Sequence, residues 1–461
     1  MLARQRGVAA TVAATVAARA AALVLGAAAL LAAPAAARAL PRFAVRNGAH
    51  CTLCHVNPNG GGGRNDYGRD VFEKTRLAFS FLDLQEKAMA GDYAEDPAGA
   101  PSAAEGKWRG FGLSGALTDW LAIGGDLRLA FLHVDKVGED PVTGDPLNTQ
   151  DFPGDGFFLM QADVYVMAQL GRFTTFYVDK SIRGAGYEAW ALYMHPGKGY
   201  VRAGHFTPSY GLRLEEHRAY VTEELGVGPL TRETGVEAGV YVGPFQLNLA
   251  LGLPFSNTAL ATGARSASAY PSYGGYATLT FAHAFKDLSL VLGLSAAVRT
   301  HASGATPLLV GATGPTPCGV QEILAGGFLG ASLGRFTYLA EADLAQNVPW
   351  VATVPPMMGE ACGTDLRVGD SSTTGFARAL AVYHELSFAV LQGFDVVGTW
   401  EFKDPDLALA SGAETRFGAG VEFFFTANSE IKLMWRHRVT KAESFHTNGE
   451  DEVLVFAHLF F

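Results

Sequence analysis

The chain has 461 residues, is 49% hydrophobic and 17% charged, and carries a net charge of −10. This hydrophobic content excludes a disordered chain, and the acidic balance argues against a nucleic-acid partner, which basic patches would attract. The length suffices for one large domain or for two.

The first 39 residues have the pattern of an export signal. Arg4 and Arg6 precede the apolar run AAALVLGAAALLAAPAAA, and residues 37–39 match the A-x-A cleavage pattern. We expect residues 1–39 to be a signal peptide, with an uncleaved membrane anchor as the alternative. The mature chain would then lie outside the cytoplasm, where disulfides persist.

Cys51, Cys54 and His55 form a C-x-x-C-H motif, the attachment pattern of c-type haem. The two thiols of such a motif bind the haem vinyl groups, and the adjacent imidazole binds the iron. A zinc site would need a further Cys or His pair, a thioredoxin-like dithiol would need a βαβ context, and a disulfide at this spacing is strained. We therefore predict one covalent haem c, with Cys51 and Cys54 as thioether links and His55 as an axial ligand.

The sequence leaves the second axial ligand open. A helix is predicted over residues 67–90 with Asp66 as its N-cap, and Met89 near its end is the candidate ligand. A lone Met on a helix more often serves packing. The alternatives are an open or water-bound position and three histidines, His50, His195 and His205.

Residues 40–108 form the predicted monohaem cytochrome c-like domain and its linker. A domain of this size barely supports a core of its own, and a covalent haem would act as a staple. The Gly-, Ala- and Pro-rich stretch GDYAEDPAGAPSAAEGK is the predicted linker into the first strand.

Residues 109–461 show the alternation of apolar and polar residues that is typical of strands. Period two is clear in LAIGGDLRLAFLH from Leu121, in FQLNLALGL from Phe245, and in EIKLMWRHRV from Glu430. No apolar run after the signal segment reaches the roughly 18 residues of a membrane helix. A membrane location therefore requires a closed barrel, the other structure that satisfies its backbone in lipid.

Three further features favour a transmembrane β-barrel over a soluble sandwich. The segments, of about 9–14 residues, match tilted membrane strands. Tight turns alternate with long connections near 134–155, 207–231, 302–320 and 346–373, as periplasmic turns alternate with outer loops. The terminal EVLVFAHLFF resembles the C-terminal signal strand of bacterial outer-membrane proteins. We predict an all-β barrel of about sixteen antiparallel strands, preceded by the small α-helical haem domain.

Cys318 and Cys362 fall in two of the long connections, which one hairpin separates. Both connections should emerge as neighbours on the outer side, in an oxidising compartment. We predict a disulfide between the two cysteines, with two unpaired thiols as the alternative.

The N-terminal motif region resembles the fused monohaem cytochrome–porins, an outer-membrane iron-oxidase family. The matching residues are Pro41, Phe43, Ala44, Cys51, Cys54, His55, Tyr67, Gly68 and Arg69. The resemblance implies a cytochrome plug in or at a porin of about sixteen strands in the outer membrane of a Gram-negative bacterium. It also implies electron transfer from an extracellular metal ion, ferrous iron in iron-oxidising members, to a soluble periplasmic cytochrome, so the candidate enzyme activity is ferrous oxidation.

Two other functions remain open. The segment Gly204–Tyr220 resembles anion-selective porins, so one alternative is a porin for small solutes or anions with an accessory haem. A second is a conduit that works outward, toward extracellular metals. The acidic residues of 135–155 would suit iron capture through oxygen ligands, with a solvated outer loop as the simpler explanation.

Overall fold

The computed structural model describes residues 41–65, 67, 68, 72, 77, 118, 120–134, 156–182, 186–195, 198–214, 216, 218–223, 225–227, 232–252, 274–303, 318–348, 377–407, 412–426, 428–441 and 447–460. The predicted signal peptide, the linker, Met89, Cys362 and the acidic stretch 135–155 lie outside the described residues. Of the helix predicted over 67–90, four residues are described.

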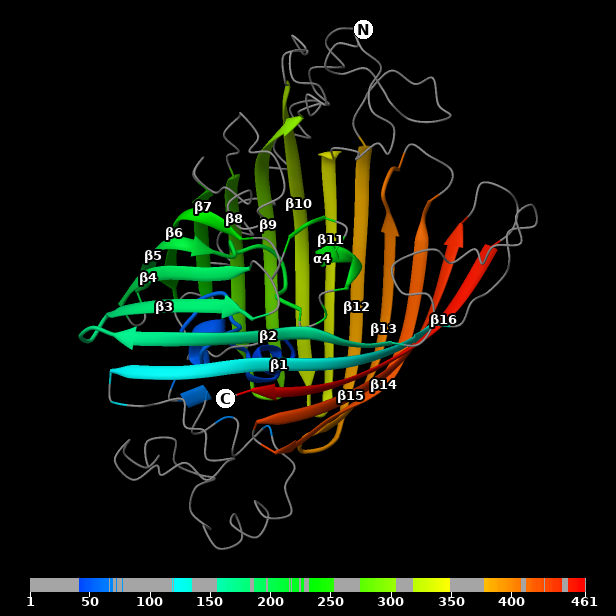
Figure 1. Ribbon diagram of the computed structural model, residues 1–461, viewed down its shortest axis with the longest axis horizontal. Helices are drawn as coiled ribbons and strands as arrows, with labels where there is room; N and C mark the ends of the chain where they lie inside the picture. The colour runs from blue at the N-terminus through cyan, green and yellow to red at the C-terminus, as the bar shows by residue number, and fades with distance from the viewer. Residues whose placement is uncertain are drawn as a thin grey trace, which may run out of the picture.

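Within the described residues, sixteen strands form one closed antiparallel barrel in which each strand pairs with its neighbours in chain order and β16 pairs with β1 (Figure 1). The strands are β1 Leu121–Val134, β2 Gly156–Gln169, β3 Thr174–Ser181, β4 Tyr187–His195, β5 Gly199–Phe206, β6 Glu233–Val242, β7 Phe245–Gly252, β8 Gly274–Ala284, β9 Leu288–Ser303, β10 Cys318–Leu333, β11 Phe336–Val348, β12 Ala377–Leu391, β13 Phe394–Asp404, β14 Glu414–Thr426, β15 Ser429–Lys441 and β16 Thr447–Phe460. Closure leaves no unpaired sheet edge. The predicted sixteen-strand barrel is confirmed.

The short connections gather at one end of the barrel, which we call the turn end; the opposite end is the loop end. The turns 243–244, 334–335 and 392–393 lie at the turn end, together with the start of β1 and the end of β16. The long connections leave from the loop end. This alternation agrees with the predicted arrangement of periplasmic turns and outer loops.

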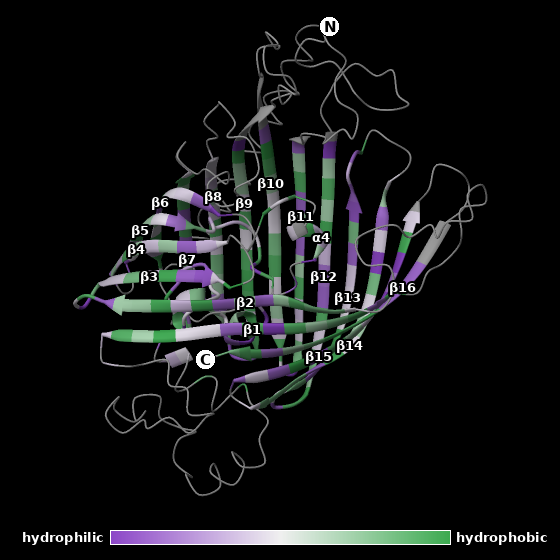
Figure 2. Cartoon of the chain, viewed as in Figure 1, coloured by the Kyte–Doolittle hydropathy of each residue, from purple (hydrophilic) through white to green (hydrophobic). Residues whose placement is uncertain are grey.

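The barrel wall is apolar outside and polar inside. On β7, Leu247 and Leu249 face outward and are exposed, whereas Gln246 and Asn248 face the lumen and are buried. Figure 2 shows the same alternation of hydrophobic and hydrophilic bands along the strands. An outer surface of this kind is suited to lipid, and a closed barrel excludes the two-sheet sandwich. None of the described helices has the length and apolar character needed to cross a bilayer.

Two strands extend further than the alternation predicts. Cys318 is the first residue of β10 and pairs with Ser303 of β9, so it begins a strand rather than lying within the connection. Strand pairing continues past the apolar segments because a backbone ladder needs no apolar side chains. The predicted disulfide to Cys362 involves a residue outside the described part of the chain and stays a prediction.

Lipid contact of the outer face predicts a depth-dependent cost of charge. Leu294 lies near the middle of β9 and is 65% exposed, whereas Leu333 ends β10 at the turn end and is 59% exposed. We expect Leu294→Arg to lower the free energy of unfolding by about 2–4 kcal/mol and the matched Leu333→Arg by about 0–1 kcal/mol. Equilibrium unfolding in lipid vesicles measures both, and equal costs would contradict a membrane-spanning wall.

Candidate functional site

The N-terminal segment 41–65, which we call the plug, lies inside the barrel near its turn end (Figure 1). Its helix α2 (Pro41–Asn47) packs against β9, β10 and β11. Pro41 suits the first helical turn, where its missing N–H is not needed, and Gly48 ends the helix with a φ of +60°. A Cβ on Gly48 would lie 2.6 Å from the backbone nitrogen of Ala284, so glycine permits this close approach to the wall.

Two arginines of α2 fasten the plug to carboxylates of the wall. The buried Arg42 guanidinium lies 3.0 Å from Glu385 and 2.5 Å from Glu422. Arg46 forms a bidentate pair with Asp395, with N–O distances of 3.0 and 2.9 Å. Since the three carboxylates belong to β12, β14 and β13, α2 is anchored to three adjacent strands.

The C-x-x-C-H motif forms one tight turn. The 3-10 helix η1 spans Cys51–Leu53, and the backbone N–H groups of Cys54 and His55 donate to the Cys51 carbonyl at 3.3 and 3.1 Å. Cys54 is buried, Cys51 is partly exposed, and both are thiols outside any disulfide of the described residues. Cys54 packs in an apolar cluster with Phe72, Leu77, Phe424 and Phe460. The three predicted haem-binding residues therefore lie together, with the two cysteines in apolar surroundings.

The His55 side chain is buried, and neither ring nitrogen has a hydrogen-bond partner among the described residues. The backbone groups of Gly61 and Gly62 interact with the ring and partly offset the lowering of its pKa, but neither meets the geometry of a hydrogen bond. Burial, together with the nearby charges of Arg64 and Arg213, lowers the pKa of His55 to about 3, so the imidazole is neutral at neutral pH. Neutral imidazole is the form that ligates metals, and buried polar atoms without partners are uncommon in proteins. The residues present therefore fit a haem group.

The glycine run 60–63 turns the chain back over His55. Gly60, Gly61 and Gly62 have φ values of +82°, +72° and +61°, which most other residues avoid. A Cβ on Gly60 would lie 3.3 Å from Cys51 Sγ, and one on Gly62 would lie 2.2 Å from the Tyr177 hydroxyl on β3. The absence of side chains at 60–63 thus lets this part of the plug fit between the C-x-x-C-H motif and the barrel wall.

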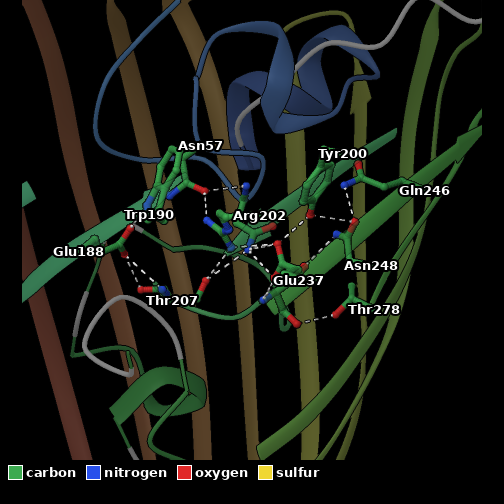
Figure 3. A network of polar contacts seen from close by, with 12 residues as sticks. Asn57, Glu188, Trp190, Tyr200, Arg202, Thr207, Glu237, Gln246, Asn248 and Thr278 are labelled. Carbon is green, nitrogen blue, oxygen red and sulfur yellow. Dashed lines mark hydrogen bonds and ion pairs between the residues drawn. The ribbon is translucent and has the colours of Figure 1, made fainter. Parts of the chain in front are cut away.

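A buried polar network joins the plug to β5 and β6 (Figure 3). The Arg202 guanidinium donates to Asn57 Oδ1 at 2.7 Å, to Glu237 Oε1 at 2.9 Å and to the Thr207 carbonyl at 3.2 Å. Asn59 Nδ2 donates to the same carboxylate and the same carbonyl. Arg202 and Glu237 are fully buried. The network therefore connects the plug, the wall and the start of the β5–β6 connection.

The β5–β6 connection folds into the lumen, which corrects the prediction that 207–231 is an outer loop. We call its described part, within 207–227, the lumen loop. The Tyr210 hydroxyl donates to Asp343 of β11 at 3.0 Å, and the Tyr220 backbone N–H donates to Glu401 of β13 at 3.0 Å. Its short helix α4 (Tyr220–Glu223) contacts β11, β12 and β13. The loop thus crosses the lumen from β5 to the opposite wall, drawn there by hydrogen bonds to inward-facing carboxylates.

Ion pairs hold the far part of the lumen loop. Glu216 pairs with Arg436 of β15, which also lies 3.0 Å from Glu452 of β16. Arg218 lies 3.2 Å from Glu452. Burial alone would raise the pKa of Glu216, but the charges of Arg436 and Arg218 hold it well below its usual range. Glu216 is therefore ionised at neutral pH.

Two histidines considered as second axial ligands face away from the lumen. His195 stacks on Phe173 and His205 on Tyr187, at positions that alternate with the inward-facing residues of β4 and β5. Strand alternation therefore excludes both as ligands of a haem in the plug. His50 lies in the plug, is buried and contacts Tyr241. Met89 lies outside the described residues, so its role stays a prediction.

Sequence reasoning missed the residues that seat the plug. Arg42 and Arg46 are spaced four apart, so they share a helix face, and this was the one local signal available. Arg202 and Glu237 carry no such signal, because an inward-facing charge on a strand looks the same whether it faces water or the plug. Among the described residues, no group of three or more His, Cys, Asp or Glu side chains forms a conventional metal site.

Comparison with protein-family models and with curated proteins finds no match. Among solved structures, OprB from Pseudomonas putida is similar with a TM-score of 0.50 and 9% identity, over 74% of this chain and 94% of that one. The channel DcaP from Acinetobacter baumannii (TM-score 0.46, 12% identity, 74% and 97% coverage) and an anion-selective porin from Comamonas acidovorans (0.44, 14%, 74% and 99%) are also similar. At these identities the likeness shows the fold alone, that of a porin-type barrel.

The α2 anchor predicts how the plug responds to loss of one charge. Arg42→Met would leave Glu385 and Glu422 buried without this partner, and removal of one member of a buried pair typically costs about 3–5 kcal/mol. We expect hydrogen exchange across 41–65 to accelerate by at least a hundredfold. The matched change Arg335→Met, at an exposed turn arginine that donates to a backbone carbonyl, should leave this exchange unchanged. Equal exchange in both variants would contradict the anchor.

Proposed function

We propose that this chain is an outer-membrane barrel that carries one covalent haem c in its lumen and transfers electrons between the two sides of the membrane. The buried imidazole of His55, unpartnered among the described residues and adjacent to Cys51 and Cys54, is the observation that carries the proposal. A haem bound there supplies one-electron redox chemistry. The barrel provides the path across lipid, which a small haem domain lacks.

In this proposal each residue of the turn has a separate task. Cys51 and Cys54 hold the haem through thioethers, and His55 binds the iron as a neutral ligand. The apolar cluster around Cys54 excludes water from that side of the site. Burial and hydrogen bonding of this kind set the potential of a haem iron. Met89 is the proposed second axial ligand.

The place of the plug suggests which partner approaches from which side. The plug contacts wall residues near the turn end, such as Ala284 and Asp395, and a barrel has its short turns in the periplasm. A soluble periplasmic cytochrome would dock at the turn end. The hydrocarbon core is about 30 Å thick, so the outer partner would enter the lumen from the loop end. Extracellular ferrous iron, as a small ion, suits that route; outward flow to a soluble metal ion would use the same path.

A second candidate function is a porin for small solutes or anions with an accessory haem. The closed sixteen-strand barrel favours it, because a barrel of this size can enclose an aqueous channel. The lumen loop would then constrict a diffusion path. The two functions differ in the width of the open channel beside the plug: a solute porin needs a wide one and an electron conduit does not.

Covalent haem is the first requirement of the proposed function. Full-length protein made with the c-type maturation machinery should carry one haem that survives a denaturing gel and gives a pyridine haemochrome spectrum. The double variant Cys51→Ala, Cys54→Ala should lose it entirely, whereas Cys318→Ala, the matched control outside the motif, should keep it. Wild-type protein without covalent haem would end this proposal.

Conductance and reduction then decide between the two functions. As an electron conduit, the protein should be reduced by ferrous iron within seconds in stopped-flow mixing, and it should conduct poorly in planar bilayers. Removal of residues 41–65 should raise single-channel conductance several-fold, since the plug crosses the lumen from β5, which Asn57 contacts, to β14, which Arg42 contacts. Large, steady wild-type conductance without haem reduction would instead establish the solute porin.

A further inference from the structure

Arg213 of the lumen loop is partly buried, and it differs from four buried arginines that face the lumen. Each of these four lies within 3.0 Å of a glutamate; the pairs are Arg202–Glu237, Arg299–Glu322, Arg416–Glu401 and Arg436–Glu452. The buried Arg128 lies 3.4 Å from Asp126. No described carboxylate forms an ion pair with Arg213. Its Nη1 atom is buried and has no hydrogen-bond partner within the described part of the chain.

The Arg213 guanidinium lies against the plug, beside the haem-attachment turn. A Cβ built on Gly61 would lie 2.9 Å from its Nη2 and 3.0 Å from its Cζ, so the planar group packs on the Gly61 backbone. Gly61 also lies beside the His55 ring, and the charge of Arg213 acts on that ring. Arg213 thus carries a positive charge from the lumen loop to the one buried imidazole that the described residues leave without a partner.

One candidate counter-ion of Arg213 is already engaged. Glu188 of β4 is within electrostatic reach of Arg213. Its Oε1 accepts the Thr207 hydroxyl at 2.8 Å, and its Oε2 accepts the Trp190 indole N–H at 3.1 Å. Arg232 also lies 3.9 Å from it. Glu188 is therefore held by other donors, and the Nη1 atom of Arg213 has no hydrogen-bond partner among the described residues.

We propose that Arg213 binds a carboxylate at the junction of the plug and the lumen loop. A guanidinium presents parallel N–H donors that match the two oxygens of a carboxylate, and a buried N–H group such as that of Arg213 Nη1 is unfavourable without an acceptor. Two sources supply this chemistry. One is a propionate of the haem, which rests on the proposed function; the other is a small carboxylate anion in the lumen, which suits the solute porin.

The haem arm has a signature besides activity. A positive charge next to the haem favours the reduced iron, because reduction adds a negative charge. Arg213→Gln removes that charge while keeping a polar side chain. Arg213→Lys keeps the charge but loses the pair of parallel N–H donors of the guanidinium. Arg218→Gln is the matched control: it removes the same charge from the same loop, at a residue that already pairs with Glu452.

All of these proteins should carry covalent haem, since the thioethers do not depend on Arg213. At a fixed applied potential we expect Arg213→Gln to lower the ratio of reduced to oxidised haem at least tenfold, which is about 59 mV for a one-electron couple. Arg213→Lys should fall between wild type and Arg213→Gln, and Arg218→Gln should change the ratio less than twofold.

The anion arm uses reversal potentials in planar bilayers with an acetate gradient. If Arg213→Gln leaves the haem potential unchanged but lowers the acetate permeability ratio several-fold relative to Arg218→Gln, the carboxylate is a lumen anion. If it matches Arg218→Gln in both measurements, Arg213 is not a carboxylate site and the inference is wrong. Absence of covalent haem in wild type would defeat the proposed function alone, and the acetate measurement would still decide the role of Arg213.

Discussion

A closed barrel wall turns half of its side chains inward, and every charge placed there must be compensated within the lumen. At the turn end the wall presents Glu385, Asp395 and Glu422 within a few strands of one another. Arg42 and Arg46 of the plug supply the opposing charges at 2.5–3.5 Å. An unpaired buried carboxylate costs several kcal/mol, so the plug belongs to the folded structure rather than being an accessory to it.

The same constraint shapes the lumen loop, with one difference. Glu341 and Asp343 lie two residues apart on β11 and face the lumen together. The loop offers them neutral donors: the Leu212 backbone N–H at 2.9 Å and the Tyr210 hydroxyl at 3.0 Å. Two ionised carboxylates this close repel each other. The hydrogen bonds from the loop compensate these carboxylates for the water that they lose inside the lumen. The loop is therefore fixed at this wall by backbone and hydroxyl donors and at the far wall by ion pairs.

The barrel could be predicted from the sequence because the alternation of apolar and polar residues shows which strand residues face lipid and which face the lumen. Ile431 and Leu433 are exposed to the outside and Lys432 and Arg436 are buried inside, as their period-two pattern predicts. The partners of the inward residues could not be predicted. Arg42 and Glu422 are separated by 380 positions, and strand alternation fixes a direction but no contact. The same limit explains why the 207–231 connection was predicted to be an outer loop: its length shows that it can leave the wall, not where it goes.

The candidate site was predictable for a different reason. The C-x-x-C-H spacing places both thiols and the imidazole on one turn through local backbone geometry, so Cys51, Cys54 and His55 needed no tertiary information. Their surroundings did need it, since the glycine run 60–63 has meaning only against the wall and Arg213. Within the proposed function this arrangement also limits the outer partner. A periplasmic protein reaches the turn end directly, whereas a partner from outside must pass the loop end and the lumen loop. That path suits an ion or small molecule better than a mineral surface, because only a small species approaches a haem held so far from the outer face.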